Sequence, residues 1–208
     1  MSELNNFENP MAVKEQTGEI VTNKELMAKA RASLNGKWGI AVSIFIIFVF
    51  VSLGVGLIPM GGSVVQILIE GALCLGLYGF VLNLIREKDI SISQLFDGFK
   101  KFGVALGTFL LVSIFTFLWS LLLIIPGIIA ALSYAMVFFI LFDDSDIGVL
   151  EAIRKSKAMM KGNKWKLFCL SWRFFWWGLL CVLTFGIGFI WLNPYMLTSK
   201  AHFYENIK

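Results

Sequence analysis

Long apolar blocks dominate the chain from Trp38 to Tyr204. A helix of about 20 residues crosses a hydrocarbon core about 30 Å thick, because each residue adds about 1.5 Å. Apolar residues make up 58% of the 208 residues and charged residues 15%, against about 45–50% and 25% in soluble domains. The sequence therefore predicts an all-α polytopic membrane bundle and excludes a soluble globular domain.

Turn signals divide these blocks into six predicted spans, arranged as three helical hairpins. The turns are expected at 59–63, 126–127 and 186–188, where proline and glycine interrupt apolar sequence. The block that contains the second turn is about 40 residues long, twice the length that a membrane needs. The predicted spans are about 38–58, 64–85, 103–125, 126–142, 165–185 and 188–204.

A basic segment with helical periodicity precedes each hairpin. In the first, Thr22 and Glu25 have the spacing of a capping box. The second runs from Ser91 to Phe102, and the third from Asp143 to Trp165. The third opens with acids and ends with lysines, which matches the helix dipole. Each segment is therefore predicted to be an amphipathic interfacial helix, and the third to cap itself with its own aspartates.

The basic residues also set the expected orientation. All of the 18 Lys and Arg residues except Arg173 lie in the segments before the hairpins or near the C-terminus, and the opposite loops carry none. The positive-inside rule then predicts a plasma-membrane protein with both termini in the cytoplasm. Residues 1–21 are expected to form a disordered cytoplasmic tail, and residues 22–208 a single membrane domain.

Three residues inside the predicted spans are candidate functional residues. Glu70 is the one acid there, and ionisable groups are costly in lipid. It could serve a small transporter or channel component, or it could be a glutamate near the outer interface. Arg173 and Trp177 lie four residues apart, which permits a cation–π contact on one helix face. A ligand groove and simple packing are both open for that face.

Asp143 and Asp144 are further candidates at the end of the fourth span. A divalent-cation site is the alternative to helix capping, although adjacent carboxylates rarely converge without further ligands. His202 has no Cys or His neighbour, so no metal and no cofactor are predicted. Catalytic motifs are missing, which predicts a non-enzymatic protein. The predicted contacts with the lipid surface are Lys155, Lys157, Lys161, Lys164 and Trp165.

Pairs of small residues four positions apart predict close packing of the helices. Such pairs occur at Ala72 and Gly76, and at Gly103 and Gly107.

Four stretches carry a resemblance to a known family: IIPGIIAALSYAMVFFILFDD (124–144), AIRKSKAMMKGNKWKLF (152–168), LTFGIGFIWLNPYM (183–196) and HFYE (202–205). The chain resembles the bacterial integral membrane family named domain of unknown function 975. More distantly, it is similar to the membrane domain of some glycerophosphodiester phosphodiesterases. The resemblance implies no established activity.

Residues and resemblance together lead us to expect a non-enzymatic membrane protein that acts in envelope homeostasis. The expected partners are anionic lipid headgroups on the cytoplasmic side, with a membrane-protein partner or a second copy of the chain as alternatives. The net charge of +4 is not a nucleic-acid signal, because the basic residues flank predicted spans.

Overall fold

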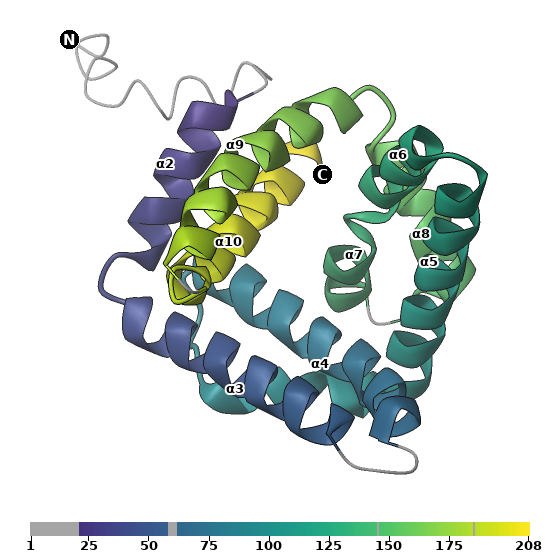
Figure 1. Ribbon diagram of the computed structural model, residues 1–208, viewed down its shortest axis with the longest axis horizontal. Coiled ribbons are helices and arrows are strands. Elements are labelled where there is room, and N and C mark those ends of the chain that lie inside the picture. Colours follow the sequence, from purple (N-terminus) through teal and green to yellow (C-terminus); the bar gives the residue numbers. More distant parts are fainter. Residues whose placement is uncertain (1–20, 58–61, 145, 185) are drawn as a thin grey trace, which may run out of the picture.

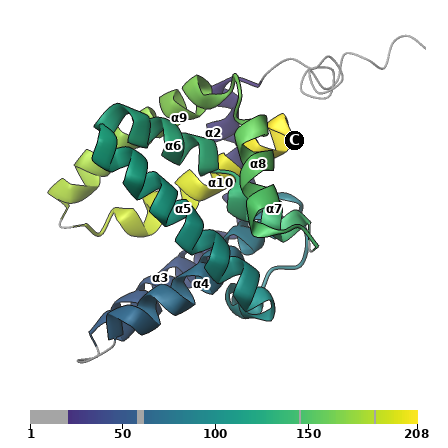
Figure 2. The same ribbon diagram turned by 90° about the vertical axis from the view of Figure 1, so that its right-hand side faces the viewer.

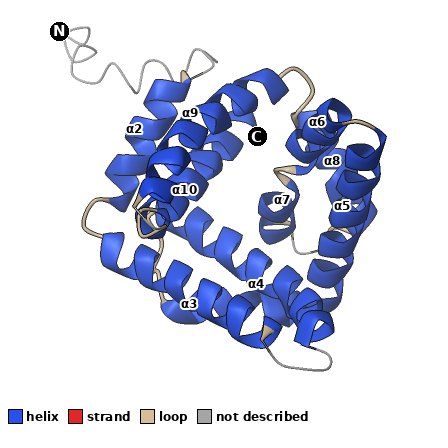
Figure 3. Cartoon of the chain, viewed as in Figure 1, coloured by secondary structure: helices blue, strands red, loops and turns tan. Residues whose placement is uncertain are grey.

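The computed structural model describes residues 21–57, 62–144, 146–184 and 186–208. Every regular element in these ranges is a helix (Figure 3), so the predicted all-α class is confirmed. The predicted tail, except for Val21, lies outside the described residues, as does most of the first predicted turn. The elements are α2 (Asn23–Leu34), α3 (Trp38–Gly56), α4 (Gly62–Ile85), the 3₁₀ helix η2 (Ile92–Lys101), α5 (Phe102–Leu122), α6 (Ile124–Tyr134), α7 (Val137–Asp143), α8 (Val149–Met159), α9 (Lys164–Leu183) and α10 (Phe189–Ile207).

Three pairs of helices that follow one another in the chain pack together: α3 with α4, α5 with α6, and α9 with α10. The joined ends of these pairs lie on the left in Figure 2, whereas α8 and the C-terminus lie on the right. We call these two sides the turn side and the terminal side. A shorter helix precedes each pair: α2 before α3, η2 before α5, and α8 before α9.

Five helical segments in the described residues are long and apolar enough to cross a membrane. They are Trp38–Gly56, Val64–Ile85, Ile92–Leu121, Ile125–Asp143 and Lys164–Leu183. The helix α10 is not among them, so the predicted arrangement of six spans is not confirmed.

The position of α10 explains its polar composition. It contacts α2, α3, α4 and α9, and its neighbours bury both apolar and polar side chains, Thr198 and Ser199 among them. The hydroxyls of these two residues donate to the backbone carbonyls of Pro194 and Tyr195. These polar groups of α10 are thus buried against other helices and hydrogen-bonded within α10.

The first helix begins as predicted. The Thr22 N–H donates to Glu25 Oε2 at 2.9 Å, and the Glu25 N–H donates to Thr22 Oγ1 at 3.3 Å, which completes the capping box. The chain leaves the helix through Gly36, whose φ of 75° suits glycine.

The second turn lies earlier than predicted. The helix α5 ends at Leu122, and Leu123 alone, in an extended conformation, separates it from α6. Pro126 falls in the first turn of α6, where proline is tolerated. The predicted span 126–142 is also not one continuous helix, because the chain breaks between Tyr134 and Val137 into α6 and α7.

The helices α4 and η2 approach each other through two glycines. A Cβ atom at Gly76 would overlap the carbonyl oxygen of Leu95, and a Cβ atom at Gly98 would overlap that of Ala72. The predicted close packing at Ala72 and Gly76 is therefore confirmed. A Cβ atom at Gly103 would meet no atom within 4 Å, so the prediction of close packing there is wrong.

The 3₁₀ geometry of η2 lines up three phenylalanines. Three residues complete one turn of such a helix, so Phe96, Phe99 and Phe102 lie above one another. Their rings stack at centroid distances of 6.4 and 6.3 Å. Leu95, which directly precedes Phe96, is fully buried, whereas the three rings are exposed.

Candidate functional site

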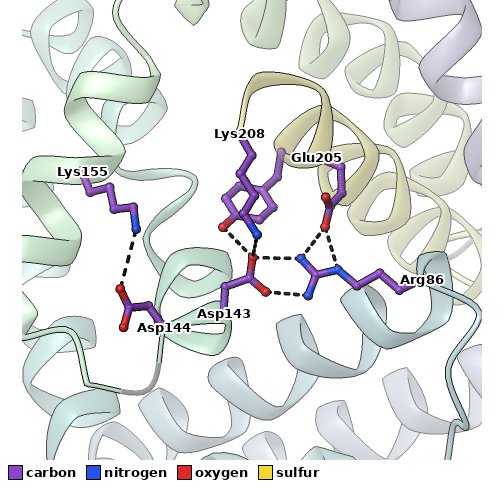
Figure 4. A network of polar contacts seen from close by, with 7 residues as sticks. Arg86, Asp143, Asp144, Lys155, Glu205 and Lys208 are labelled. Carbon is purple, nitrogen blue, oxygen red and sulfur yellow. Dashed lines mark hydrogen bonds and ion pairs between the residues drawn. The ribbon is translucent and has the colours of Figure 1, made fainter. Parts of the chain in front are cut away.

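A cluster of charged side chains joins three helix ends on the terminal side. Arg86 directly follows α4, Asp143 is the last residue of α7, and Tyr204, Glu205 and Lys208 belong to the end of α10. Figure 4 shows the side chains of Arg86, Asp143, Glu205 and Lys208 pointing toward one another from their separate helices. We call Arg86, Asp143, Tyr204, Glu205 and Lys208 the terminal cluster.

Arg86 is the centre of the terminal cluster. Its Nη1 donates to Asp143 Oδ1 at 2.6 Å, and its Nη2 donates to Asp143 Oδ2 at 2.8 Å. Its Nε also donates to Glu205 Oε1 at 2.7 Å. A planar guanidinium in two-pronged contact with a carboxylate makes one of the stronger ion pairs in proteins.

Asp143 accepts two further hydrogen bonds. The Tyr204 hydroxyl donates to Oδ2 at 2.9 Å, and Lys208 Nζ donates to the same oxygen at 2.6 Å. The Tyr204 ring itself stacks on Phe139 with a centroid distance of 5.3 Å. The side chain of Asp143 is only 11% exposed, and that of Arg86 24%. This pairing is therefore shielded from water much more than an ordinary surface ion pair.

The cluster keeps Arg86 charged. Hydrogen bonding to Asp143 raises the pKa of the Arg86 guanidinium above its ordinary value, and Glu205 adds to this, while partial burial opposes it. The arrangement holds the ends of α4, α7 and α10 together by charge.

The predicted self-capped helix from Asp143 to Trp165 is wrong. The helix α8 begins at Val149 after Gly148, and no side chain caps it. Asp143 instead ends α7, where the negative end of the helix dipole disfavours a carboxylate. The hydrogen bonds from Arg86 and Lys208 outweigh this effect, and Arg86 lies 57 residues away in the chain.

Asp144 turns away from Asp143 and toward α8. Its Oδ2 lies 3.7 Å from Lys155 Nζ, and both side chains are about half exposed. The two carboxylates face different cations and do not converge on a shared ligand. Among the described residues, no group of three or more His, Cys, Asp or Glu side chains could hold a metal ion.

The helix α8 buries one face and exposes its lysines. Ala152, Ile153 and Ser156 are buried, and the Ser156 hydroxyl donates to the carbonyl of Ser133 at 2.8 Å, which anchors α8 to α6. Lys155, Lys157 and Lys161 are exposed, Lys164 is half-buried, and Trp165 is 74% exposed at the start of α9. We call these four lysines and Trp165 the basic face.

Glu70 belongs to α4, where its side chain is half-buried and contacts α3. The Ser52 hydroxyl donates to Glu70 Oε2 at 3.1 Å. This hydrogen bond joins two neighbouring helices, as a structural contact does.

Arg173 and Trp177 are both exposed on α9. No cation–π contact between them is found in the described part of the chain, whereas the rings of Trp172 and Trp176 meet edge to face with a centroid distance of 6.2 Å. Trp177 instead lines a cavity between α9, α10 and α2. The sequence left a ligand groove and simple packing open for this face; Trp177 lines this cavity, and Arg173 is not among the lining residues.

The sequence pointed to Asp143 but not to its partners. Arg86, Glu205 and Lys208 each follow or end a helix on the terminal side, and their charges complement one another. Complementary charges at the ends of predicted helices were the sequence signal that could have identified these partners.

Several apolar helices in packed pairs, with charged groups gathered at their ends, define a multi-pass α-helical membrane protein. The family model described as "Protein of unknown function (DUF975)" matches residues 20–131 and 120–208. The chain belongs to this family, as the resemblance indicated. No curated protein and no solved structure matches the chain.

Proposed function

We propose that this protein is a non-enzymatic component of the bacterial plasma membrane that binds anionic lipid headgroups through its basic face. Its role would be in envelope homeostasis. The observation that carries the proposal is the exposure of Lys155 and Lys157 of α8 and of Lys161 just after it, followed in the chain by the exposed Trp165.

The chemistry of the basic face suits the inner surface of a membrane. Each lysine near an anionic surface contributes about 1 kcal/mol of attraction, and tryptophan is enriched at the level of the headgroups. The helix α8, which carries Lys155 and Lys157, lies on the terminal side (Figure 2). In the proposed topology α10 is the sixth span, so both termini and the basic face are cytoplasmic.

Replacing Lys155, Lys157, Lys161 and Lys164 by Gln is expected to remove anionic lipid from the protein's surroundings. The full-length chain would be extracted with its native lipid in polymer nanodiscs, and the phosphatidylglycerol content would be compared with that of the bulk membrane. We expect enrichment around the wild type that the variant loses, and that falls as salt rises.

The matched control replaces the same four lysines by Arg, which preserves the charge. This variant is expected to keep the enrichment. Equal phosphatidylglycerol around the wild type and the Gln variant would refute the lipid-binding proposal.

A further inference from the structure

A cavity of about 370 Å³ lies where α2 meets the paired helices α9 and α10. Half of its eight lining residues are aromatic: Trp38 at the start of α3, Trp177 of α9, and Trp191 and Tyr195 of α10. Arg31 of α2 supplies its one cationic group, and Cys181 lies deeper along α9. Figure 1 shows α2, α9 and α10 lying side by side.

The arginine has a fixed place in this wall. Its Cζ lies 5.8 Å from the centroid of the Tyr195 ring, and the Tyr195 hydroxyl donates to the Met27 carbonyl at 3.1 Å. This hydrogen bond attaches α2 to α10 one turn before Arg31. No carboxylate of the described residues pairs with Arg31 within 4.0 Å, so its charge is available to an anion.

The lining of the cavity changes from charged to apolar along α10. Arg31 lies over Tyr195, and the wall continues through Trp191 to Gly188 at the turn. The eight residues from Gly188 to Tyr195 span about 10 Å. A phospholipid has the same order, because its charged phosphate adjoins apolar acyl chains. Indole rings give a flat apolar contact for such a chain.

We infer that this cavity binds one phospholipid with an anionic headgroup, with its phosphate at Arg31 and an acyl chain along Trp177 and Trp191. The inference rests on the proposed affinity for anionic lipid but adds a second site, which is distinct from the basic face of α8. The basic face attracts many exchanging lipids, whereas the cavity holds one.

The test uses the purified full-length protein in detergent and native mass spectrometry with added phosphatidylglycerol. Arg31→Gln is expected to weaken binding of the first lipid about tenfold or more, because a charge-assisted contact to the phosphate is lost. The double variant Trp177→Ala with Trp191→Ala is expected to weaken it severalfold. Lys24→Gln, which changes an exposed lysine of the same helix outside the cavity, is expected to bind as the wild type does.

Further arms separate this inference from the proposed function. The variant with Gln at the four lysines of the basic face is expected to keep the tightly bound lipid, even where enrichment in nanodiscs is lost. Equal binding by the wild type and Arg31→Gln, with unchanged melting temperatures, would overturn the inference. Competition by glycerol phosphate at concentrations similar to phosphatidylglycerol would also overturn it, since the site would then bind a free anion.

Discussion

Gly76→Ala is expected to destabilise the protein by at least about 3 kcal/mol. The new methyl group would overlap the carbonyl oxygen of Leu95, and Gly98 of η2 packs equally closely against the backbone of Ala72. Neither backbone can move without separating α4 from η2. Thermal unfolding in detergent should show a melting temperature lower by roughly 6–12 °C, or no folded protein at all.

Gly103→Ala is the matched control for this experiment. Gly103 lies in the first turn of α5, and an added Cβ would meet no atom within 4 Å. Alanine is favoured over glycine in a helix by about 0.5–1 kcal/mol, so this variant is expected to be as stable as the wild type or slightly more stable. An equal loss of stability in both variants would show that the tight glycine contact between α4 and η2 is not what matters.

Arg86→Gln and Asp143→Asn are each expected to lower the free energy of unfolding by about 2–3 kcal/mol. Removing one partner of a buried ion pair costs about 3–5 kcal/mol, and the residual exposure of Arg86, 24%, lowers that figure. The double variant should lose much less stability than the two single variants lose together, because the interaction between Arg86 and Asp143 is lost only once. Melting temperatures of the four proteins in one detergent measure this coupling.

The pair formed by Asp144 and Lys155 provides the control for the cycle. It is longer, at 3.7 Å, and both side chains are about half exposed. Removing either partner should change stability by no more than about 0.5 kcal/mol. Additive effects of Arg86→Gln and Asp143→Asn would mean that the terminal cluster does not hold the helix ends together.

Much of the fold was predictable because local chemistry decides it. The apolar blocks led to α3, α4, α5 and α9, and the Thr22 capping box gave the start of α2 to the residue. The break between α6 and α7 was not predictable, since no proline or glycine marks it. In an apolar block many positions suit several packings, so such breaks are set by neighbouring helices.

The candidate site, like the fold, was predictable only where local sequence decides the structure. Asp143 stood out because an acid pair follows an apolar block, but its carboxylate was assigned to the wrong partner. Arg86 is 57 residues away and Lys208 is 65. Such pairings depend on how the helix pairs pack, which periodicity within one helix does not report. The lysines of α8 were found because their exposure follows from the local pattern of one helix.

The topology with a cytoplasmic terminal side is tested most directly by cysteine labelling in intact cells. In a background with Cys74, Cys169 and Cys181 replaced by Ser, Ser63→Cys and Ser91→Cys would be treated with a membrane-impermeant maleimide. The account predicts labelling at position 63 in intact cells and at position 91 only after permeabilisation. Labelling at 91 with protection at 63 would contradict it and would place the basic face of α8 outside the cell.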